Sequence, residues 1–144
     1  EAEDAYRKAL EIKPDYHVAW NNLGLLLHEK LQRPVEAEDA YRKALEIKSD
    51  KHEAWYNLGN LLGQQERYTE AEACYRKGLE ILLESESIFY NLGCLHALQN
   101  HKTQALTYLE KAIALNPQEC KSMAQQDKDF QSLWEDEDFR RLVR

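Results

Sequence analysis

Three asparagines stand at equivalent places in the chain, each two residues before a glycine, in the segments AWNNLG, AWYNLG and IFYNLG. They are Asn22, Asn57 and Asn91, which lie 35 and 34 residues apart. A primary amide offers both a hydrogen-bond donor and an acceptor, which matches the N–H and C=O groups of a peptide backbone. A ladder of evenly spaced amides would therefore hold an extended polypeptide without reading its side chains.

The elements that carry these amides are predicted to be amphipathic helices. Trp20, Leu23, Gly24 and Leu27 follow the i, i+3, i+4, i+7 spacing of one helix face. Because each residue turns a helix by roughly 100°, Asn22 lies about 200° from Trp20. We therefore expect the tryptophan and leucines to face the core and the asparagine to face away from it.

Other residues near the outward side of these helices complete the predicted peptide-binding site. The full set is Asn22, Asn57, Asn91, Asn60, Tyr56, Tyr90, Glu29, Glu53 and Gln64. The set contains acidic residues but no lysine or arginine, which favours neutral or basic partners because opposite charges steer association. Two explanations of the asparagines remain open at this stage. They form a backbone-binding ladder, or they are tolerated at an outward position and were copied when the repeats duplicated.

The chain is repetitive throughout most of its length. The segment EAEDAYRKALEIK begins at Glu1 and again, unchanged, at Glu36, and relatives of it begin at Glu70 and Gln104. These segments alternate with the W/F-x-x-L-G segments at a period of 34 to 35 residues. The joint pattern W-x-x-L-G followed by A-x-x-x-Y resembles the tetratricopeptide repeat. In the third repeat Leu109 replaces the aromatic residue.

The resemblance implies an all-α fold, a right-handed superhelical solenoid of antiparallel helix pairs with a concave inner face. It places the candidate site on that inner face and implies a non-catalytic module for binding proteins. The expected boundaries are 1–15 for the second helix of a truncated repeat, 16–50, 51–85 and 86–119 for three repeats, and 120–144 for C-terminal capping helices.

Two places depart from the repeat pattern. The loop Leu31–Pro34 is expected to be one residue longer than its counterparts, and the helix that starts near Tyr68 lacks a stop signal and is expected to run long. After Gln118, Asp127 and Asp136 are the predicted N-caps of two short helices. This tail resembles the capping segments that follow bacterial repeat arrays. Docking of a partner through Trp134 is the alternative.

Catalytic and metal-binding chemistry is not expected. The five histidines are interpreted as half-exposed polar residues, and no pair of them has metal-ligand spacing together with a third ligand. Cys74, Cys94 and Cys120 are interpreted as free thiols of a reducing compartment, which predicts a cytoplasmic protein. No cofactor motif occurs, so we predict neither an enzyme nor a cofactor.

Charge and composition narrow the partners. The 144 residues carry a formal net charge of −7, which argues against nucleic acid and against an anionic membrane surface. A protein or peptide partner remains, with the chain a monomer or weakly self-associating through its N-terminal end. The alternatives to peptide binding are a structural spacer or self-association segment, or a regulatory domain of an enzyme encoded outside this fragment.

Overall fold

The computed structural model describes residues 1–144 as helices joined by short turns, with no β-strand. The predicted all-α class of antiparallel helix pairs is confirmed. The chain divides into two compact units, Glu1–Ile81 (unit 1) and Leu82–Arg144 (unit 2), which we describe separately. No helix combines the length and the apolar character that crossing a membrane requires.

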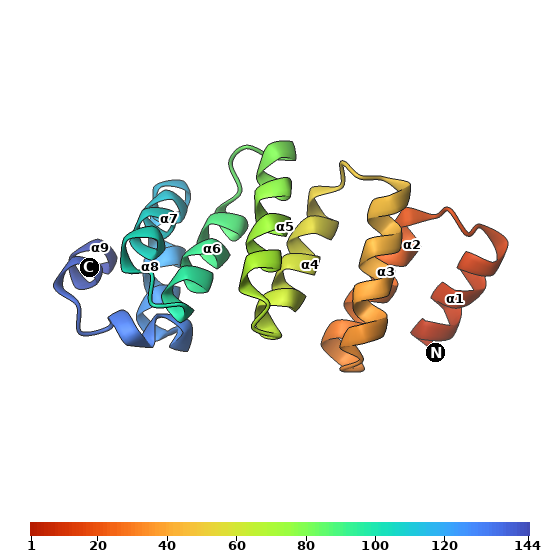
Figure 1. Cartoon of the computed structure of the whole chain (residues 1–144), viewed down its shortest axis with the longest axis horizontal. Helices are drawn as coiled ribbons and strands as arrows, with labels where there is room; N and C mark the ends of the chain where they lie inside the picture. The colour runs from red at the N-terminus through yellow and green to blue at the C-terminus, as the bar shows by residue number, and fades with distance from the viewer. The chain divides into compact units, whose positions relative to one another are not determined.

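Unit 1 consists of one single helix and two helix pairs (Figure 1). In chain order the elements are α1 (Ala2–Ile12), α2 (His17–Leu25), the π-helical turn η1 (Leu26–Lys30), α3 (Pro34–Ile47), α4 (His52–Gln64) and α5 (Tyr68–Ile81). The helices α2 and α3 pack as one pair, and α4 and α5 as the next. The helix α5 ends at Ile81, so the longer helix expected from the sequence is wrong.

Each pair of unit 1 is closed by an aromatic ring on a glycine. A Cβ atom on Gly24 would lie 2.6 Å from the ring of Tyr41, and one on Gly59 would lie 2.7 Å from the ring of Tyr75. Both tyrosines are buried. The glycines are therefore required because the helix backbone itself forms the surface on which the rings pack.

The tryptophans of the motif lie less deep than the sequence suggests. Trp20 and Trp55 are half-buried, and each indole N–H donates to a backbone carbonyl of the preceding turn, at 2.8 Å to Pro14 and at 2.8 Å to Ser49. We predicted that these tryptophans face the core, but each side chain remains partly exposed. Their N–H groups hold the turn before each first helix through these hydrogen bonds.

The first repeat has one residue more than the second, and this residue is accommodated in the π-helical turn η1. Leu31 N donates to Leu26 O, a π-type bond that widens the last turn. The turn that follows is unchanged, because Gln32 adopts a positive φ of 51° and its counterpart Glu66 one of 61°. The longer loop predicted between Leu31 and Pro34 is therefore wrong, since η1 takes up the added length.

An arginine before each second helix links neighbouring elements of unit 1. Arg33 contacts Glu36 of its own repeat at 2.6 Å and Glu3 of α1 at 2.8 Å. Arg67 repeats the arrangement with Glu70 at 2.8 Å and with Glu38 of α3 at 2.7 Å. The hydrogen bonds from these arginines lower the pKa values of Glu36 and Glu70.

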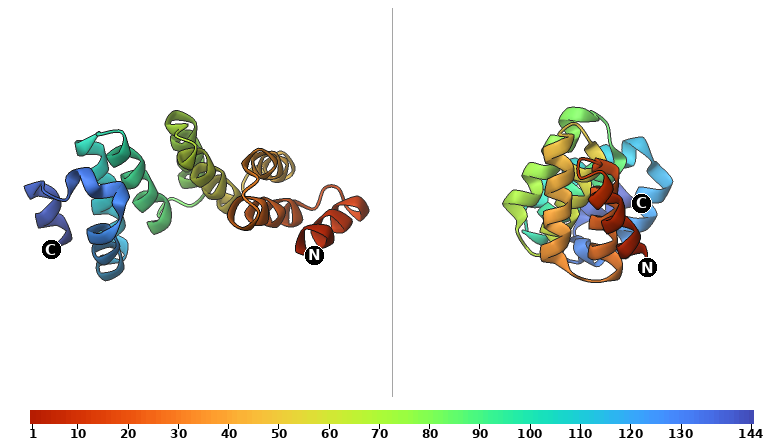
Figure 2. Two further views of the ribbon diagram at one scale, coloured as in Figure 1. Left: turned by 90° about the horizontal axis from the view of Figure 1, so that it is seen from below. Right: turned by 90° about the vertical axis from the view of Figure 1, so that its right-hand side faces the viewer.

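Unit 2 is one helix pair followed by a folded C-terminal segment. Its elements are α6 (Glu86–Leu98), α7 (Lys102–Leu115), α8 (Pro117–Gln126), the 3₁₀ helix η2 (Lys128–Leu133) and α9 (Glu137–Val143). Figures 1 and 2 show α8, η2 and α9 (blue) gathered against α6 and α7, and we call these three elements the cap. Asp127 and Asp136 cap η2 and α9 through hydrogen bonds to backbone N–H groups, as predicted.

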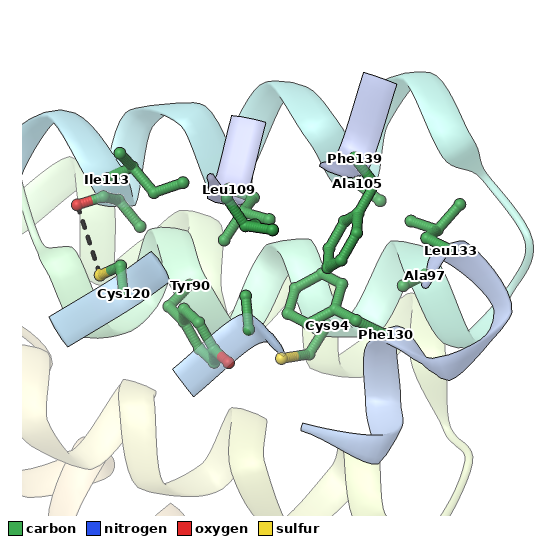
Figure 3. Packing of buried hydrophobic residues seen from close by; sticks show 13 residues of the cluster. Tyr90, Cys94, Ala97, Ala105, Leu109, Ile113, Cys120, Phe130, Leu133 and Phe139 are labelled. Carbon is green, nitrogen blue, oxygen red and sulfur yellow. Dashed lines mark hydrogen bonds between the residues drawn. The ribbon is translucent and has the colours of Figure 1, made fainter. Parts of the chain in front are cut away.

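The cap contributes six of the thirteen buried residues in the hydrophobic cluster of unit 2 (Figure 3). Phe130 is fully buried and Phe139 is 2% exposed, and their ring centroids lie 5.7 Å apart. The tip of the Phe130 ring lies 3.4 Å from the place that a Cβ on Gly93 would take. Trp134 is only half-buried, while Leu133 and Val143 are buried. These contacts support a capping function for the segment.

Candidate functional site

The asparagines of unit 1 that are predicted to bind a peptide lie on α2 and α4, each the first helix of a helix pair. Asn22 projects from α2 and Asn57 from α4, and both are half-buried, whereas the leucines that follow them, Leu23 and Leu58, are buried in the core. We call the surface formed by the predicted site residues of unit 1 the amide wall; they are Asn22, Asn57, Asn60, Tyr56, Glu29, Glu53 and Gln64. The helix phase predicted for the asparagines therefore agrees with their positions in the structure.

A hydrogen bond that the sequence did not reveal joins the two helices of the amide wall. The side-chain N–H of Asn57 donates to the Oδ1 atom of Asn21 at 3.2 Å. Asn21 is only 6% exposed, so this bond satisfies a buried polar group and fixes the orientation of the Asn57 amide. Asn22 lies beside this pair and has no hydrogen-bond partner within the protein.

Two predicted site residues of α4, Asn60 and Tyr56, already contact Tyr75 of α5. The hydroxyl of the buried Tyr75 donates to Oδ1 of Asn60. The ring of Tyr56 is half-buried and lies 6.4 Å from the ring of Tyr75. Asn60 therefore has less capacity to accept a hydrogen bond from a ligand than Asn22 or Asn57.

The π-helical turn brings His28 between α3 and α4. Its Nε2 atom lies 2.7 Å from Oε1 of Gln64, and its Nδ1 atom lies 3.4 Å from the hydroxyl of Tyr41. With Nε2 protonated, His28 donates to Gln64 and accepts from Tyr41. Burial raises the pKa of the Tyr41 hydroxyl, which stays protonated and can donate. Gln64, a predicted site residue, is thus held by His28.

The acidic residues of the amide wall differ in their surroundings. Glu29 is exposed and forms no ion pair. Glu53 is contacted by Nζ of Lys51 at 3.4 Å and by Nε2 of His52 at 2.7 Å. Part of the negative charge expected on this surface is therefore offset by Lys51, in the turn before α4.

The corresponding surface of unit 2 is different. Asn91 is half-buried on α6, but Tyr90 is only 4% exposed, because the cap packs over it. The Tyr90 hydroxyl donates to Oδ2 of Asp127 at 3.0 Å, and its ring meets that of Phe130 edge-on at 5.6 Å. The prediction that Tyr90 is available to a ligand is therefore wrong.

The histidines and cysteines divide by burial. His17, His28 and His52 are half-buried as predicted, but His96 is only 5% exposed. It takes the position near the end of the first helix that the buried Leu27 and Leu62 hold in unit 1. All three cysteines are free and buried, and burial raises the pKa of the Cys74 thiol to about 11. Burial also raises the pKa of the Cys94 thiol. None of these thiols is poised as a nucleophile.

Several known structures are similar to this chain. The crystal structure of MamA superimposes with a TM-score of 0.82 at 19% identity, covering 98% of this chain and 80% of the other. The structure of YrrB, described as a TPR protein with an unusual peptide-binding site, gives 0.75 at 27% identity and covers 98% and 74%. The structure of pilF from Pseudomonas aeruginosa gives 0.80 at 28% identity and covers 99% and 72%.

Sequence comparisons identify the family. No curated protein sequence matches the chain at a significant level. A sequence profile described as Tetratricopeptide repeat matches residues 15–84 and again residues 50–118, which together span most of the chain. The repeated ring-on-glycine pairs of unit 1 agree with this assignment. The chain therefore belongs to the tetratricopeptide repeat family.

Proposed function

We propose that this domain binds an extended polypeptide segment on the amide wall of unit 1, and that Asn22 and Asn57 bond to the backbone of that segment. A non-catalytic scaffold role is typical of the family. The similar YrrB structure, whose description names a peptide-binding site, supports a peptide as the ligand. Asn91 holds the equivalent position on α6, but the proposal depends on unit 1 alone.

The observation that carries the proposal is the pair of differently engaged amides. Asn57 uses one N–H on Asn21, so its amide plane is fixed while its Oδ1 and second N–H remain for a ligand. Asn22 beside it has no partner within the protein although it is half-buried. A half-buried amide without a partner gains most from a ligand that supplies both a donor and an acceptor.

The charge of the wall narrows the ligand class. Glu29 is exposed without an ion pair, whereas Glu53 is already contacted by Lys51 and His52. We therefore propose a neutral ligand or one with a single basic residue placed near Glu29. A strongly acidic segment would meet the repulsion of Glu29 and of the net negative charge of the chain.

The experiment measures how peptide affinity changes when Asn22 and Asn57 are replaced. Short random peptides displayed on phage are selected on the wild-type chain, and the affinities of the enriched sequences are measured by fluorescence anisotropy. Asn22→Ala combined with Asn57→Ala removes two or more hydrogen bonds of about 0.5–1.5 kcal/mol each, which weakens binding by roughly 5- to 150-fold. Peptides of different sequence should lose similar factors, because backbone groups are common to all of them.

Asn21→Ala is the matched comparison. It removes the buried partner of Asn57, so we expect a lower melting temperature together with weaker binding. Asn22→Ala should weaken binding at an unchanged melting temperature. If Asn22→Ala binds the selected peptides normally, the amides are inherited features of the repeat and the proposal fails.

A second candidate function, self-association, has one observation in its favour. Residues 1–13 and 36–48 have the same sequence, and in α3 this sequence buries Ala37 and Tyr41. In α1 the equivalent residues are the exposed Ala2 and the half-buried Tyr6. Sedimentation velocity tests this candidate: association that grows with concentration and is lost in Tyr6→Glu supports it, whereas a monomer throughout rejects it.

A further inference from the structure

The cap brings three metal-ligating side chains together in unit 2. Cys94 comes from α6, and Asp127 and Asp129 come from the start of η2, more than thirty residues later. One ligand atom from each of the three lies within 4.8 Å of both others. Cys94 is 7% exposed and Asp127 is half-buried, so the cluster has a buried sulfur and reaches solvent on its carboxylate side. Figure 3 shows Cys94 beside Phe130 at this junction.

The distance between the sulfur and one carboxylate oxygen suits a tetrahedral ion. Zinc binds thiolate sulfur at about 2.3 Å and carboxylate oxygen at about 2.0–2.2 Å, so the two donors of a tetrahedral site lie about 3.5 Å apart. The Sγ atom of Cys94 lies 3.7 Å from Oδ2 of Asp127. The sulfur and the first oxygen therefore need to move by only a few tenths of an ångström to share an ion.

The two carboxylates have no cation of their own. Asp127 accepts only from neutral donors: the hydroxyl of Tyr90 at 3.0 Å, the thiol of Cys94 and the backbone N–H of Asp129 at 3.0 Å. Neither Asp127 nor Asp129 forms an ion pair, and the Asp129 carboxylate has no hydrogen-bond partner within the protein. Two neighbouring, partly desolvated carboxylates repel each other, and a bound cation would relieve that repulsion.

We propose that Cys94, Asp127 and Asp129 bind a divalent transition-metal ion of the zinc type, with water as the fourth ligand. On binding, the Cys94 thiol releases its proton to solvent and its sulfur bonds to the metal, while each carboxylate contributes one oxygen. Tyr90 is not a ligand, but its hydrogen bond orients Asp127. The ion joins α6 to η2, so its binding stabilises unit 2 against opening of the cap.

Cobalt(II) and zinc(II) serve as probes on the whole chain of 144 residues. With one equivalent of cobalt we expect a thiolate-to-cobalt absorption band in the near ultraviolet and the visible bands of a tetrahedral ion. With zinc we expect a higher melting temperature of unit 2. Cys94→Ala should abolish the near-ultraviolet band, and Asp129→Asn should weaken zinc binding at least tenfold.

Asp129→Asn also keeps the test independent of folding defects. Without metal it should melt at the same temperature as the wild type or higher, because it removes one of two repelling carboxylates. Control variants are Cys74→Ala, a buried cysteine in unit 1, and His101→Gln, which removes the imidazole whose Nδ1 lies 3.3 Å from Nδ1 of His96. Both controls should retain the cobalt band and the zinc response.

Two results would overturn the proposal. The first is a wild-type chain that shows neither the cobalt band nor a zinc-dependent melting temperature. The second is a metal response that survives in Cys94→Ala and Asp129→Asn but disappears in His101→Gln, which would place the ion on the histidines instead.

Discussion

The two units close their helix pairs in different ways. In unit 1 the ring on the glycine belongs to the same pair, Tyr41 on Gly24 and Tyr75 on Gly59. In unit 2 the equivalent tyrosine is replaced by Leu109, and the ring that reaches Gly93 is Phe130 of the cap. The difference shows that a repeat can take its aromatic residue from outside itself, and that the cap of unit 2 is part of a repeat core as well as a cover.

Removal of η2 and α9 from the cap is expected to have the largest effect. Deleting residues 127–144 removes Phe130, Leu133, Phe139 and Val143, all of them buried. Each buried side chain contributes roughly 1.5–3 kcal/mol, so the sum reaches the whole stability of a small domain, about 5–15 kcal/mol. We expect unit 2 to lose its cooperative melting transition in circular dichroism. Deleting residues 1–15, which bury only Leu10, should lower the melting temperature less. Equal losses would contradict the comparison.

A single substitution tests the contribution of Phe130, the aromatic ring that the cap places at Gly93. Phe130→Ala should cost about 3–5 kcal/mol, the range for a fully buried phenylalanine. If Phe130 stands in for the missing tyrosine, Leu109→Tyr should be destabilising alone but should restore part of the stability lost in Phe130→Ala. Urea unfolding of both single variants and the double variant gives the coupling free energy, expected at about 0.5–3 kcal/mol. Additive effects would show that the two rings occupy unrelated places.

Alanine at the glycines should have unequal effects. In Gly24→Ala the new Cβ would meet the buried Tyr41 ring at 2.6 Å, so the helices must separate, at a cost of about 1–3 kcal/mol. In Gly93→Ala the nearest atom is the carbonyl oxygen of Ala105 at 3.3 Å, and the gain in helix propensity, up to about 1 kcal/mol, offsets most of the contact. Chemical denaturation measures both, and adding Tyr41→Leu should rescue Gly24→Ala. A larger loss in Gly93→Ala would reverse the comparison.

Acid sensitivity is the smallest expected difference. Hydrogen bonds from Lys102 and from the backbone N–H of Phe139 lower the pKa of Asp136. A carboxyl group with a lowered pKa adds stability above its unfolded pKa of about 3.9, and this stability is lost as the pH falls through the folded pKa. Asp136→Asn should therefore reduce the fall in melting temperature of unit 2 below about pH 4. Asp39→Asn, at an exposed position of α3, should leave the pH profile unchanged. If both profiles coincide with the wild type, the cap is held by its apolar side chains alone.

The fold could be predicted from the sequence because each repeat carries the same short-range residue patterns. The outward helix phase of the asparagines and the N-caps Asp127 and Asp136 depend on residues within one or two turns of each other, and the structure agrees with both. Such short-range patterns survive without knowledge of the tertiary structure.

Only part of the candidate site could be predicted from the sequence. The outward direction of Asn22 and Asn57 follows from helix phase, but the bond from Asn57 to Asn21 depends on how two helices 36 positions apart are packed. The burial of Tyr90 likewise depends on where the cap folds. The repeat pattern marked this place only by the replacement of the tyrosine with Leu109, and it did not indicate that Phe130 of the cap would lie at Gly93.

The π-helical turn η1 has a consequence for how the repeat array changes over time. One additional residue was accommodated within a helix, and the left-handed turn residue Gln32 and the following helix α3 kept their geometry. An insertion in the turn itself would have displaced α3 from its packing against α2. A helix end of this kind can take up one added residue as a wider turn, so a change of length there leaves the α2–α3 pair intact.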